Sequence, residues 1–166
     1  MTSDPGSPEA RMQRLEDLAA IRRLRMEYHR CVNTRTMTEA AVLYTDDAFV
    51  DFGPTEQARG RAEITALYAR YNRQLDMIKQ FPHNHMIDLN GDEASGEAYA
   101  NARYGYDGHS IMACASYDEK YRRTPEGWKI AEMLVTIHFA VPVMQGWAGG
   151  GPNYAAWDRK TPIDKG

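Results

Sequence analysis

The feature that most constrains the fold is a change in the spacing of apolar residues near the middle of the chain. Before this point apolar residues recur at steps of three or four, the period of a helix, whereas from His83 onward they alternate as in a strand. The turn sequences NGDE, YDGH and TPEG divide the alternating part into four long strands of an antiparallel meander. Helices, one strand, a helix and then a meander predict an α+β fold whose helices cover one face of a curved sheet.

Three helices are predicted in the first half of the chain. Ser7 and Pro8 are suited to the cap and the first position of a helix that ends near Asn33. Thr36 and Glu39 have the spacing of a capping box, which opens a short second helix. The third helix is predicted at about residues 61–76, and the strand AFVDFG precedes it at residues 48–53.

The chain of 166 residues is long enough for one domain of ordinary size, which we place at residues 8–140. Residues 1–7 form a polar leader broken by Pro and Gly, which is typical of disorder. The extension at residues 141–166 is rich in Gly and Pro but carries Trp147, Tyr154 and Trp157. Because this is more aromatic surface than a solvated tail exposes, we expect the extension to pack on the domain or on a neighbouring subunit.

Charge and composition argue against several classes of partner. The formal net charge is -3, and the 20 basic residues form no stripe of the kind that nucleic acid requires. No apolar stretch reaches the roughly 18 residues of a membrane span. Cys31 and Cys114 are only two thiols, and the first residues lack the apolar core of a secretion signal. We therefore expect a cytoplasmic protein that binds neither nucleic acid nor membrane.

Small residues follow one face of the predicted strand EAYANARYGY. That face carries Ala98, Ala100 and Ala102, followed by Tyr104 and Tyr106. Three alanines leave volume that a core ordinarily fills with larger side chains. Either a helix lies very close to this face or a ligand occupies the space, and the sequence leaves both interpretations open.

The stretch FPHNHMIDL contains the histidines best suited to chemistry. Histidine exchanges protons near neutral pH, and we favour His85 over His83 because it lies deeper in the strand. Strict alternation puts His83 and His85 on one face and Asn84 on the other. A metal site would need three or four ligands, but only the two histidines share a face because Asp88 falls on the opposite one. We therefore predict no metal site in this stretch.

Two polar residues on the first predicted helix are further candidates. Tyr28 lies on the apolar stripe of that helix, and a buried phenol needs a partner for its hydroxyl. Asn33 lies just beyond the last apolar position, where a side chain can lean over the open end of a sheet. Both residues are equally well explained as structural, with Tyr28 in the core and Asn33 as the helix stop. The pattern does not decide whether His138 points inward or outward.

Six segments follow one another in this order: AAIRRLRMEYHRCVN, AAVLYTDDAFVDFG, GRAEITALY, HNHMIDLNGDEASGEAYA, SYDEKY and GWKIAEM. In this order the chain resembles the SnoaL-like branch of the nuclear transport factor 2-like (NTF2-like) superfamily. The resemblance runs from about Leu15 to Phe139. The members of the family that look most like this chain include scytalone dehydratase, bile-acid dehydratase and hexachlorocyclohexane dehydrochlorinase. It implies a cone in which three helices from the N-terminal half pack on a strongly curved, mostly antiparallel sheet that encloses an apolar pocket. It also implies a homo-oligomer, with a trimer favoured and a dimer as the alternative.

The resemblance also implies site residues. The family's histidine corresponds to His85, or to His83 if the register slips, and the family's tyrosine corresponds to Tyr28. The family's aspartate near the end of the first helix is replaced here by Asn33, and a second acidic position by Ala102. Since an amide can orient a histidine but adds no charge, we expect His85 to be a weaker base than its counterparts.

These observations predict a cofactor-independent lyase that eliminates water from a hydrophobic aromatic or polycyclic alcohol, with or without a following carbon–carbon cleavage that releases a one-carbon fragment. His85, Tyr28 and Asn33 are the predicted catalytic residues. The alternatives are an isomerase or cyclase of the same fold, and a non-catalytic protein that binds a ligand or resembles the small subunit of ring-hydroxylating oxygenases. The predicted substrate-binding residues are His83, Tyr104, Asn101, His138 and Ala102.

Overall fold

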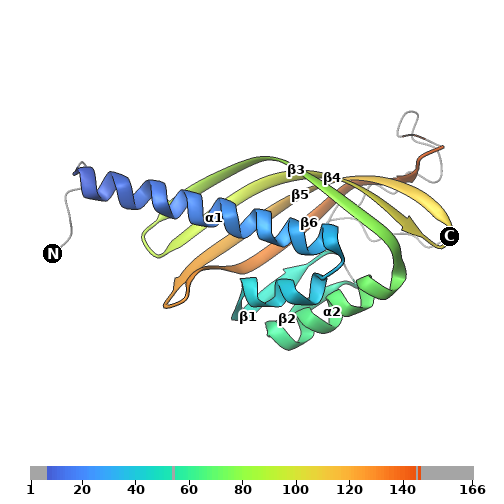
Figure 1. Cartoon of the computed structure of the whole chain (residues 1–166), viewed down its shortest axis with the longest axis horizontal. Helices are drawn as coiled ribbons and strands as arrows, with labels where there is room; N and C mark the ends of the chain where they lie inside the picture. The colour runs from blue at the N-terminus through green and yellow to red at the C-terminus, as the bar shows by residue number, and fades with distance from the viewer. Residues whose placement is uncertain (1–6, 54, 145, 147–166) are drawn as a thin grey trace.

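A computed structural model describes residues 7–53, 55–144 and 146 of the chain. Within this part, three helices lie against a sheet of six strands, and the predicted α+β fold class is confirmed (Figure 1). The elements are α1 (Pro8–Thr34), η1 (Met37–Leu43), β1 (Tyr44–Asp51), β2 (Gln57–Arg59), α2 (Gly60–Gln74), β3 (Leu75–Asn90), β4 (Glu93–Tyr106), β5 (His109–Thr124) and β6 (Gly127–Pro142).

The sheet has the strand order β2-β1-β6-β5-β4-β3. Strands β3 to β6 form the antiparallel meander that alternation predicts, and among the described strands only β1 and β6 pair in parallel. Strand β2 was not predicted, because three residues are too few to show an alternating pattern. Residues 1–6 of the predicted leader (residues 1–7) and most of the C-terminal extension lie outside the described residues. None of the described helices is both long and apolar enough to cross a membrane.

The predicted start of α1 is confirmed, since the Ala10 amide donates a 3.1 Å hydrogen bond to Ser7 Oγ. The helix ends at Thr34 and is capped by Arg35, whose φ of 62° is left-handed. The predicted capping box is wrong, because Thr36 makes no side-chain capping bond and the segment that follows is a 3-10 helix. Helix α2 matches the predicted third helix to within about two residues.

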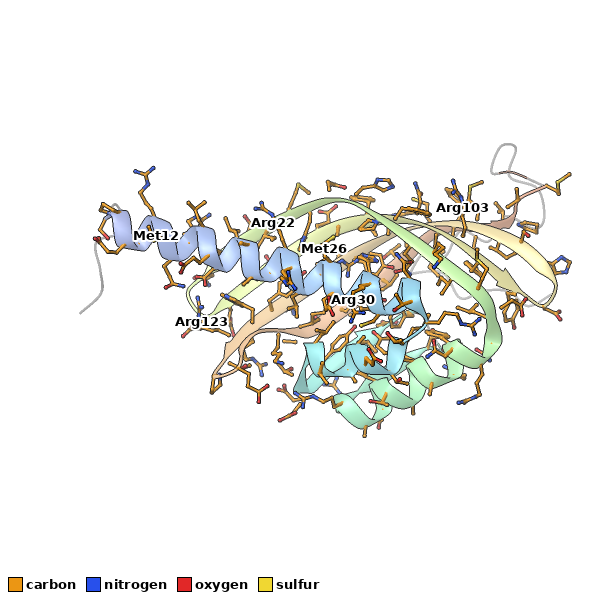
Figure 2. The ribbon with its side chains drawn as sticks, viewed as in Figure 1. Met12, Arg22, Met26, Arg30, Arg103 and Arg123 are labelled. Atoms are coloured by element: carbon orange, nitrogen blue, oxygen red, sulfur yellow. The ribbon has the colours of Figure 1, made fainter. Side chains whose placement is uncertain are left out.

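Helix α1 is fastened to the sheet near its N-terminal end by Asp17. Trp128 Nε1 on β6 donates a 3.1 Å hydrogen bond to Asp17 Oδ1, and Arg123 on β5 forms a 2.6 Å ion pair with Oδ2. Arg123 also lies over the Trp128 ring, 4.5 Å from its centroid, beside α1 (Figure 2). This anchor fixes which face of α1 meets the sheet.

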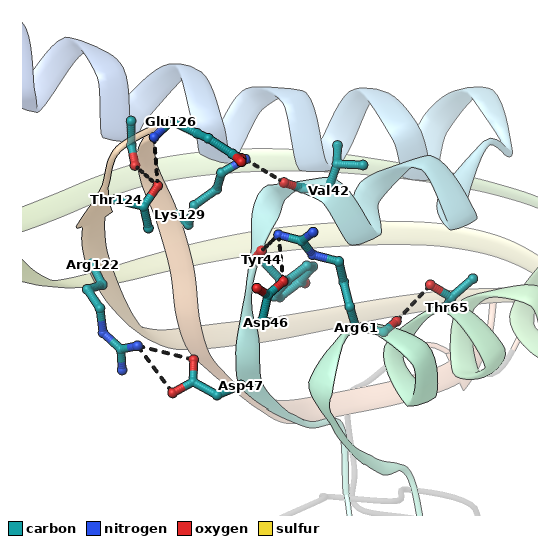
Figure 3. Close-up of polar contacts among 11 residues, drawn as sticks. Val42, Tyr44, Asp46, Asp47, Arg61, Thr65, Arg122, Thr124, Glu126 and Lys129 are labelled. Carbon is teal, nitrogen blue, oxygen red and sulfur yellow. Dashed lines mark hydrogen bonds and ion pairs between the residues drawn. The ribbon is translucent and has the colours of Figure 1, made fainter.

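Further charged side chains tie β1 to its neighbours. Arg61 at the start of α2 donates to the Tyr44 carbonyl oxygen and pairs with Asp46 at 3.2 Å (Figure 3). Arg122 on β5 pairs with Asp47 at 3.1 Å. These pairs are partly exposed and each adds at most about 1 kcal/mol, so they position β1 more than they stabilise it.

Strand β3 contains an irregularity that changes which histidine faces inward. The strand begins at Leu75 rather than at His83, so the two histidines lie within it and not at its mouth. Pro82 pairs with Ala100 and His85 pairs with Ala98, which is a step of three residues on β3 against two on β4. The extra residue is a β-bulge, which reverses the alternation beyond it. The prediction that His83 and His85 share a face is therefore wrong: His85 is half-buried and His83 is exposed.

The alanine face of β4 is on the inner side, as predicted. Ala98 and Ala100 are each 2% exposed, and Ala102 is half-buried. Ala98 pairs with Tyr117 on β5, and the Arg25 guanidinium of α1 lies over the Tyr117 ring. Small side chains on β4 thus lie next to large aromatic and charged ones.

Candidate active site

A buried ion pair joins α1 to the centre of the sheet. Arg25 Nη1 lies 2.7 Å from Glu119 Oε1 on β5, and both side chains have no solvent exposure. Tyr121, two positions further along the same strand face, donates a 2.6 Å hydrogen bond to Glu119 Oε2. His85 Nε2 on β3 lies 3.1 Å from the Tyr121 hydroxyl oxygen. Four side chains from three elements therefore form one continuous hydrogen-bonded chain, which we call the Arg25–His85 relay.

The direction of each hydrogen bond in the relay follows from the groups that can only accept. Both oxygens of Glu119 accept hydrogen bonds, from Arg25 and from Tyr121, which is the pattern of an ionised carboxylate. Since the Tyr121 proton is committed to Glu119, the Tyr121 oxygen accepts from His85 Nε2–H. This network assigns the remaining lone pair of His85 to Nδ1. Nδ1 is buried and has no hydrogen-bond partner within the described residues.

A second histidine, His29, lies one helical turn after Arg25 on α1. Its Nδ1 lies 2.9 Å from Gln80 Oε1 on β3, and an amide oxygen can only accept, so Nδ1 carries the proton. Its Nε2 is buried and unpartnered in the part of the chain that the structure describes. His29 is 3% exposed and packs edge-on against the rings of Tyr28 and Tyr117.

Burial and a neighbouring cation keep both histidines neutral. Burial, followed by the Arg25 guanidinium, lowers the pKa of His29 to about 3. Burial and then Arg25 and Arg22 lower the pKa of His85 to about 4. At neutral pH each ring therefore presents an unprotonated, unpartnered nitrogen, which is the state that a general base requires.

The pKa of Glu119 responds to two opposed effects. Burial raises the pKa of the Glu119 carboxyl, and the Arg25 cation opposes this change. Glu119 in turn raises the pKa of Arg25 although burial alone would lower it. The two charges stabilise each other in a site that would penalise either alone, so we treat the pair as ionised.

A glycine on β4 makes room for the His85 end of the relay. A Cβ atom at Gly96 would lie 2.9 Å from Tyr121 Cε2 and 3.0 Å from His85 Nε2. Real Cβ atoms essentially never come as close as 2.9 Å, so a side chain here would require the Tyr121 ring or its surroundings to shift. Gly96 is therefore a positioning residue of this site.

The structure brings Tyr28 into the same buried cluster. Its ring lies 5.2 Å from the Arg25 guanidinium and 5.2 Å from the His29 ring. Burial raises the pKa of Tyr28 well above its ordinary value, so the phenol stays protonated. Tyr28 is thus a protonated phenol that lies beside His29.

Asn33 occupies a different place from the one expected. Its Nδ2 donates to the Gln80 carbonyl oxygen at 2.9 Å, and its Oδ1 accepts from the Gln80 amide at 2.6 Å. Asn33 therefore holds the backbone of the residue whose side chain binds His29. The group that holds His85 is Tyr121, not Asn33.

The predicted substrate-binding residues divide between the two faces of the sheet. Tyr104 and Ala102 are half-buried on the inner face. Three others are exposed on the outer face, where His83 Nε2 lies 2.9 Å from Asn101 Nδ2 and His138 stacks on Tyr99. His83, Asn101 and His138 are consequently separated from the relay by the sheet itself.

Several residues of the cluster were missed by sequence reasoning. Arg25 and His29 interrupt the apolar stripe of α1 at a spacing of four, and this was the signal for a charged group facing the core. Glu119 and Tyr121 share a strand face, but nothing local marks that face as the buried one. The bond from Gln80 to His29 joins positions 51 residues apart and has no sequence signature.

Helices on one side of a curved, mostly antiparallel sheet, with a polar cluster buried between them, define an NTF2-like protein of the α+β class. Residues 13–134 match the model of the SnoaL-like domain, and the chain belongs to that family.

The chain is also similar to other proteins by sequence and by structure. An uncharacterized protein of Mycobacterium tuberculosis, Rv2910c, is 24% identical over 135 residues, which cover 75% of this chain and 88% of that protein. A hexachlorocyclohexane dehydrochlorinase (LinA) of type 2 superposes with a TM-score of 0.76 at 19% identity, covering 84% of this chain and 98% of that one. A candidate scytalone dehydratase from Novosphingobium aromaticivorans gives 0.72 at 18% identity, covering 78% and 89%. At these identities the structural similarity shows the fold.

Proposed function

We propose that the protein is a cofactor-independent lyase that eliminates water from a hydrophobic aromatic or polycyclic alcohol, with His85 as the acid–base group. The observation that carries the proposal is the buried, unpartnered Nδ1 of His85, whose other ring nitrogen is held by Tyr121. A histidine fixed on one side and free on the other is arranged to take and return a proton. The similarity to proteins named as a dehydratase and a dehydrochlorinase supports an elimination.

In the proposed reaction, His85 Nδ1 accepts a proton from a C–H or O–H group of the substrate. The carbon–oxygen bond to the departing hydroxyl then breaks, and the same proton passes from His85 to that hydroxyl, which leaves as water. With a pKa of about 4 His85 is a weak base, so the substrate must ionise easily. Its protonated form is correspondingly acidic, which favours the return of the proton.

The other predicted residues receive supporting roles in this proposal. Tyr28 donates a hydrogen bond to the reacting oxygen, and Asn33 positions His29 through Gln80. Tyr104 and Ala102 line the substrate's side of the sheet. Two further predictions come from the sequence: the protein forms a homo-oligomer, with a trimer favoured, and it is cytoplasmic.

The test compares wild type with His85→Gln on a panel of benzylic and polycyclic alcohols, with products identified by mass spectrometry. We expect a product lighter by one water and a fall in kcat of about 100- to 10,000-fold in the variant. The matched control is His109→Gln, which replaces an exposed histidine at the start of β5 and should keep full activity. A product of unchanged mass would identify an isomerase instead, and undiminished turnover by His85→Gln would remove His85 from the mechanism.

A further inference from the structure

We propose that the free edge of the Arg25 guanidinium binds an oxyanion of an aromatic substrate, either a phenolate or a carboxylate; the role of that oxygen in elimination rests on the proposed lyase function. Glu119 engages Nη1 of Arg25, while Nε and Nη2 are buried without hydrogen-bond partners in the described chain. An oxyanion fits these two donors, whereas a neutral apolar group leaves them unsatisfied.

The geometry of the guanidinium makes these two donors a single binding edge. The N–H groups of Nε and Nη2 point the same way, and this two-donor edge pairs side-on with a planar acceptor such as a carboxylate. The contact of Glu119 with Nη1 leaves that edge open. The guanidinium also lies over the Tyr117 ring, 3.9 Å from its centroid, which fixes the plane in which the edge points.

The energetic cost of the free edge supports a ligand in this place. A buried donor without an acceptor is destabilising, and more so when the group is charged. Arg25 is fully buried and carries two such donors at once. An oxyanion would satisfy both with one group, and it would do so in a medium where charge-assisted hydrogen bonds are strong.

The groups around Arg25 are complementary to an oxyanion and its proton. His29 Nε2 and His85 Nδ1 are acceptors, and both histidines lie close enough for the Arg25 charge to lower their pKa values. Neither nitrogen can bind an anion while the ring is neutral, but either can accept the proton that a phenol releases. The Glu119 carboxylate is already engaged by Arg25 and Tyr121.

From a phenol with a para benzylic alcohol, this arrangement allows water to be eliminated without any other reactant. The phenol proton passes to His85, and the resulting phenolate is held by Arg25. An electron pair from the phenolate oxygen forms the carbonyl of a quinone methide as the benzylic carbon–oxygen bond breaks. The departing hydroxide takes the proton from His85 and leaves as water. A carboxylate in the same position would anchor the substrate without taking part in bond breaking.

Binding can be measured without turnover. We would titrate the full chain with 4-nitrophenol, benzoate and benzyl alcohol as phenolate, carboxylate and neutral probes, using calorimetry and the visible absorbance of the nitrophenolate. We expect at least one anionic probe to bind about tenfold or more tightly than benzyl alcohol. If 4-nitrophenol binds most tightly, and is bound as its phenolate, the oxyanion of the substrate is a phenolate. If benzoate binds most tightly, the oxyanion is a carboxylate.

The decisive variant is Arg25→Lys, which keeps a cation near Glu119 but lacks the two-donor edge. We expect it to lose the preference for anions by about tenfold or more, while Arg30→Lys, an exposed position on the same helix, retains it. The double variant Arg25→Met with Glu119→Met removes both charges together and guards against a buried unpaired charge that unfolds the single variant. Circular dichroism would check that each variant is folded.

Equal binding of the anionic and neutral probes by wild type would overturn the proposal, as would an anion preference that survives in folded Arg25→Lys and in the double variant. These outcomes are separate from the test of the lyase function. If anions bind through Arg25 but no alcohol loses water, the lyase function fails and the oxyanion site stands. If water is lost and Arg25→Lys binds the probes as wild type does, the oxyanion site fails and the lyase function stands.

Discussion

The imidazole Nε2 of His85 and the hydroxyl of Tyr121 lie 3.1 Å apart, although the two residues are 36 positions apart on strands β3 and β5. Strand β4 runs between those strands, and the contact passes over it at Gly96, where no side chain stands in the way. Because Tyr121 is bound to Glu119 on its other side, the contact fixes both the ring orientation and the tautomer of His85.

Loss of the Tyr121 hydroxyl should impair catalysis more than binding. In Tyr121→Phe, His85 Nε2 has no acceptor, so the ring can change tautomer and present a proton at Nδ1 in place of the lone pair. We expect kcat to fall about 10- to 100-fold with little change in KM, by the general precedent of residues that orient an active group. Steady-state kinetics would measure this, with Tyr106→Phe, at the exposed end of β4, as the control. An unchanged kcat would show that Tyr121 does not set the state of His85.

A methyl group at Gly96 should separate the same two residues. In Gly96→Ala the new Cβ atom would meet Tyr121 Cε2 at 2.9 Å and His85 Nε2 at 3.0 Å unless they move. We expect a loss of about 1–3 kcal/mol in the free energy of unfolding, together with reduced turnover. Urea unfolding measures the first effect and kinetics the second. The neighbouring exposed Ser95→Ala should be nearly neutral in both, and a stable, fully active Gly96→Ala would contradict the close packing described here.

Replacing Asn33 by Asp should not create a stronger base at His85. Asn33 Nδ2 donates to the Gln80 carbonyl oxygen, and an aspartate at this position has no donor to replace it. We expect Asn33→Asp to lose about 1–3 kcal/mol of stability, because a carbonyl loses its partner next to a new charge. Activity should fall, and the pH dependence of kcat/KM attributable to His85 should stay in place. A rise in that apparent pKa towards neutrality would instead place Asn33 beside His85.

The buried histidines should make the protein less stable in acid. Burial lowers the pKa of His29 from 6.5 to about 3. Below pH 6.5, His29 therefore binds a proton in the unfolded chain but not in the native state. Stability is therefore fully present above pH 6.5 and is lost as the pH falls towards about 3, by up to about 1.4 kcal/mol per pH unit for this one group. His85 acts in the same direction down to about pH 4, whereas Glu119, whose pKa burial raises, acts in the opposite direction.

The share of His29 can be isolated by comparing wild type with His29→Gln. Urea unfolding between pH 7 and pH 4 should give a flatter dependence of the free energy of unfolding in the variant, and the two proteins should differ most in acid. His109→Gln, at an exposed position, supplies the control. Parallel curves for wild type and His29→Gln would mean that His29 titrates normally in the native state.

Most of the architecture could be predicted from the sequence, because it depends on local periodicity. The helical stripe of α1, its Ser7 cap, the position of α2 and the antiparallel meander all follow from spacing within a few residues of each other. The order of the segments was also sufficient for the SnoaL-like resemblance. The errors in this part were equally local: the segment after Thr36 winds as a 3-10 helix without a side-chain cap, and the short β2 carries too little pattern.

The composition of the candidate site was decided by tertiary structure. A single bulge after Pro82 turns His85 inward and leaves His83 outside, and alternation cannot reveal a bulge because it assumes regular pairing. The ion pair of Arg25 with Glu119 joins positions 94 residues apart. The sequence determined which faces of each helix and strand are apolar, since that depends on neighbours along the chain. Only the packing of those faces decided which polar groups were buried together, because burial and pairing depend on distances that no local spacing encodes.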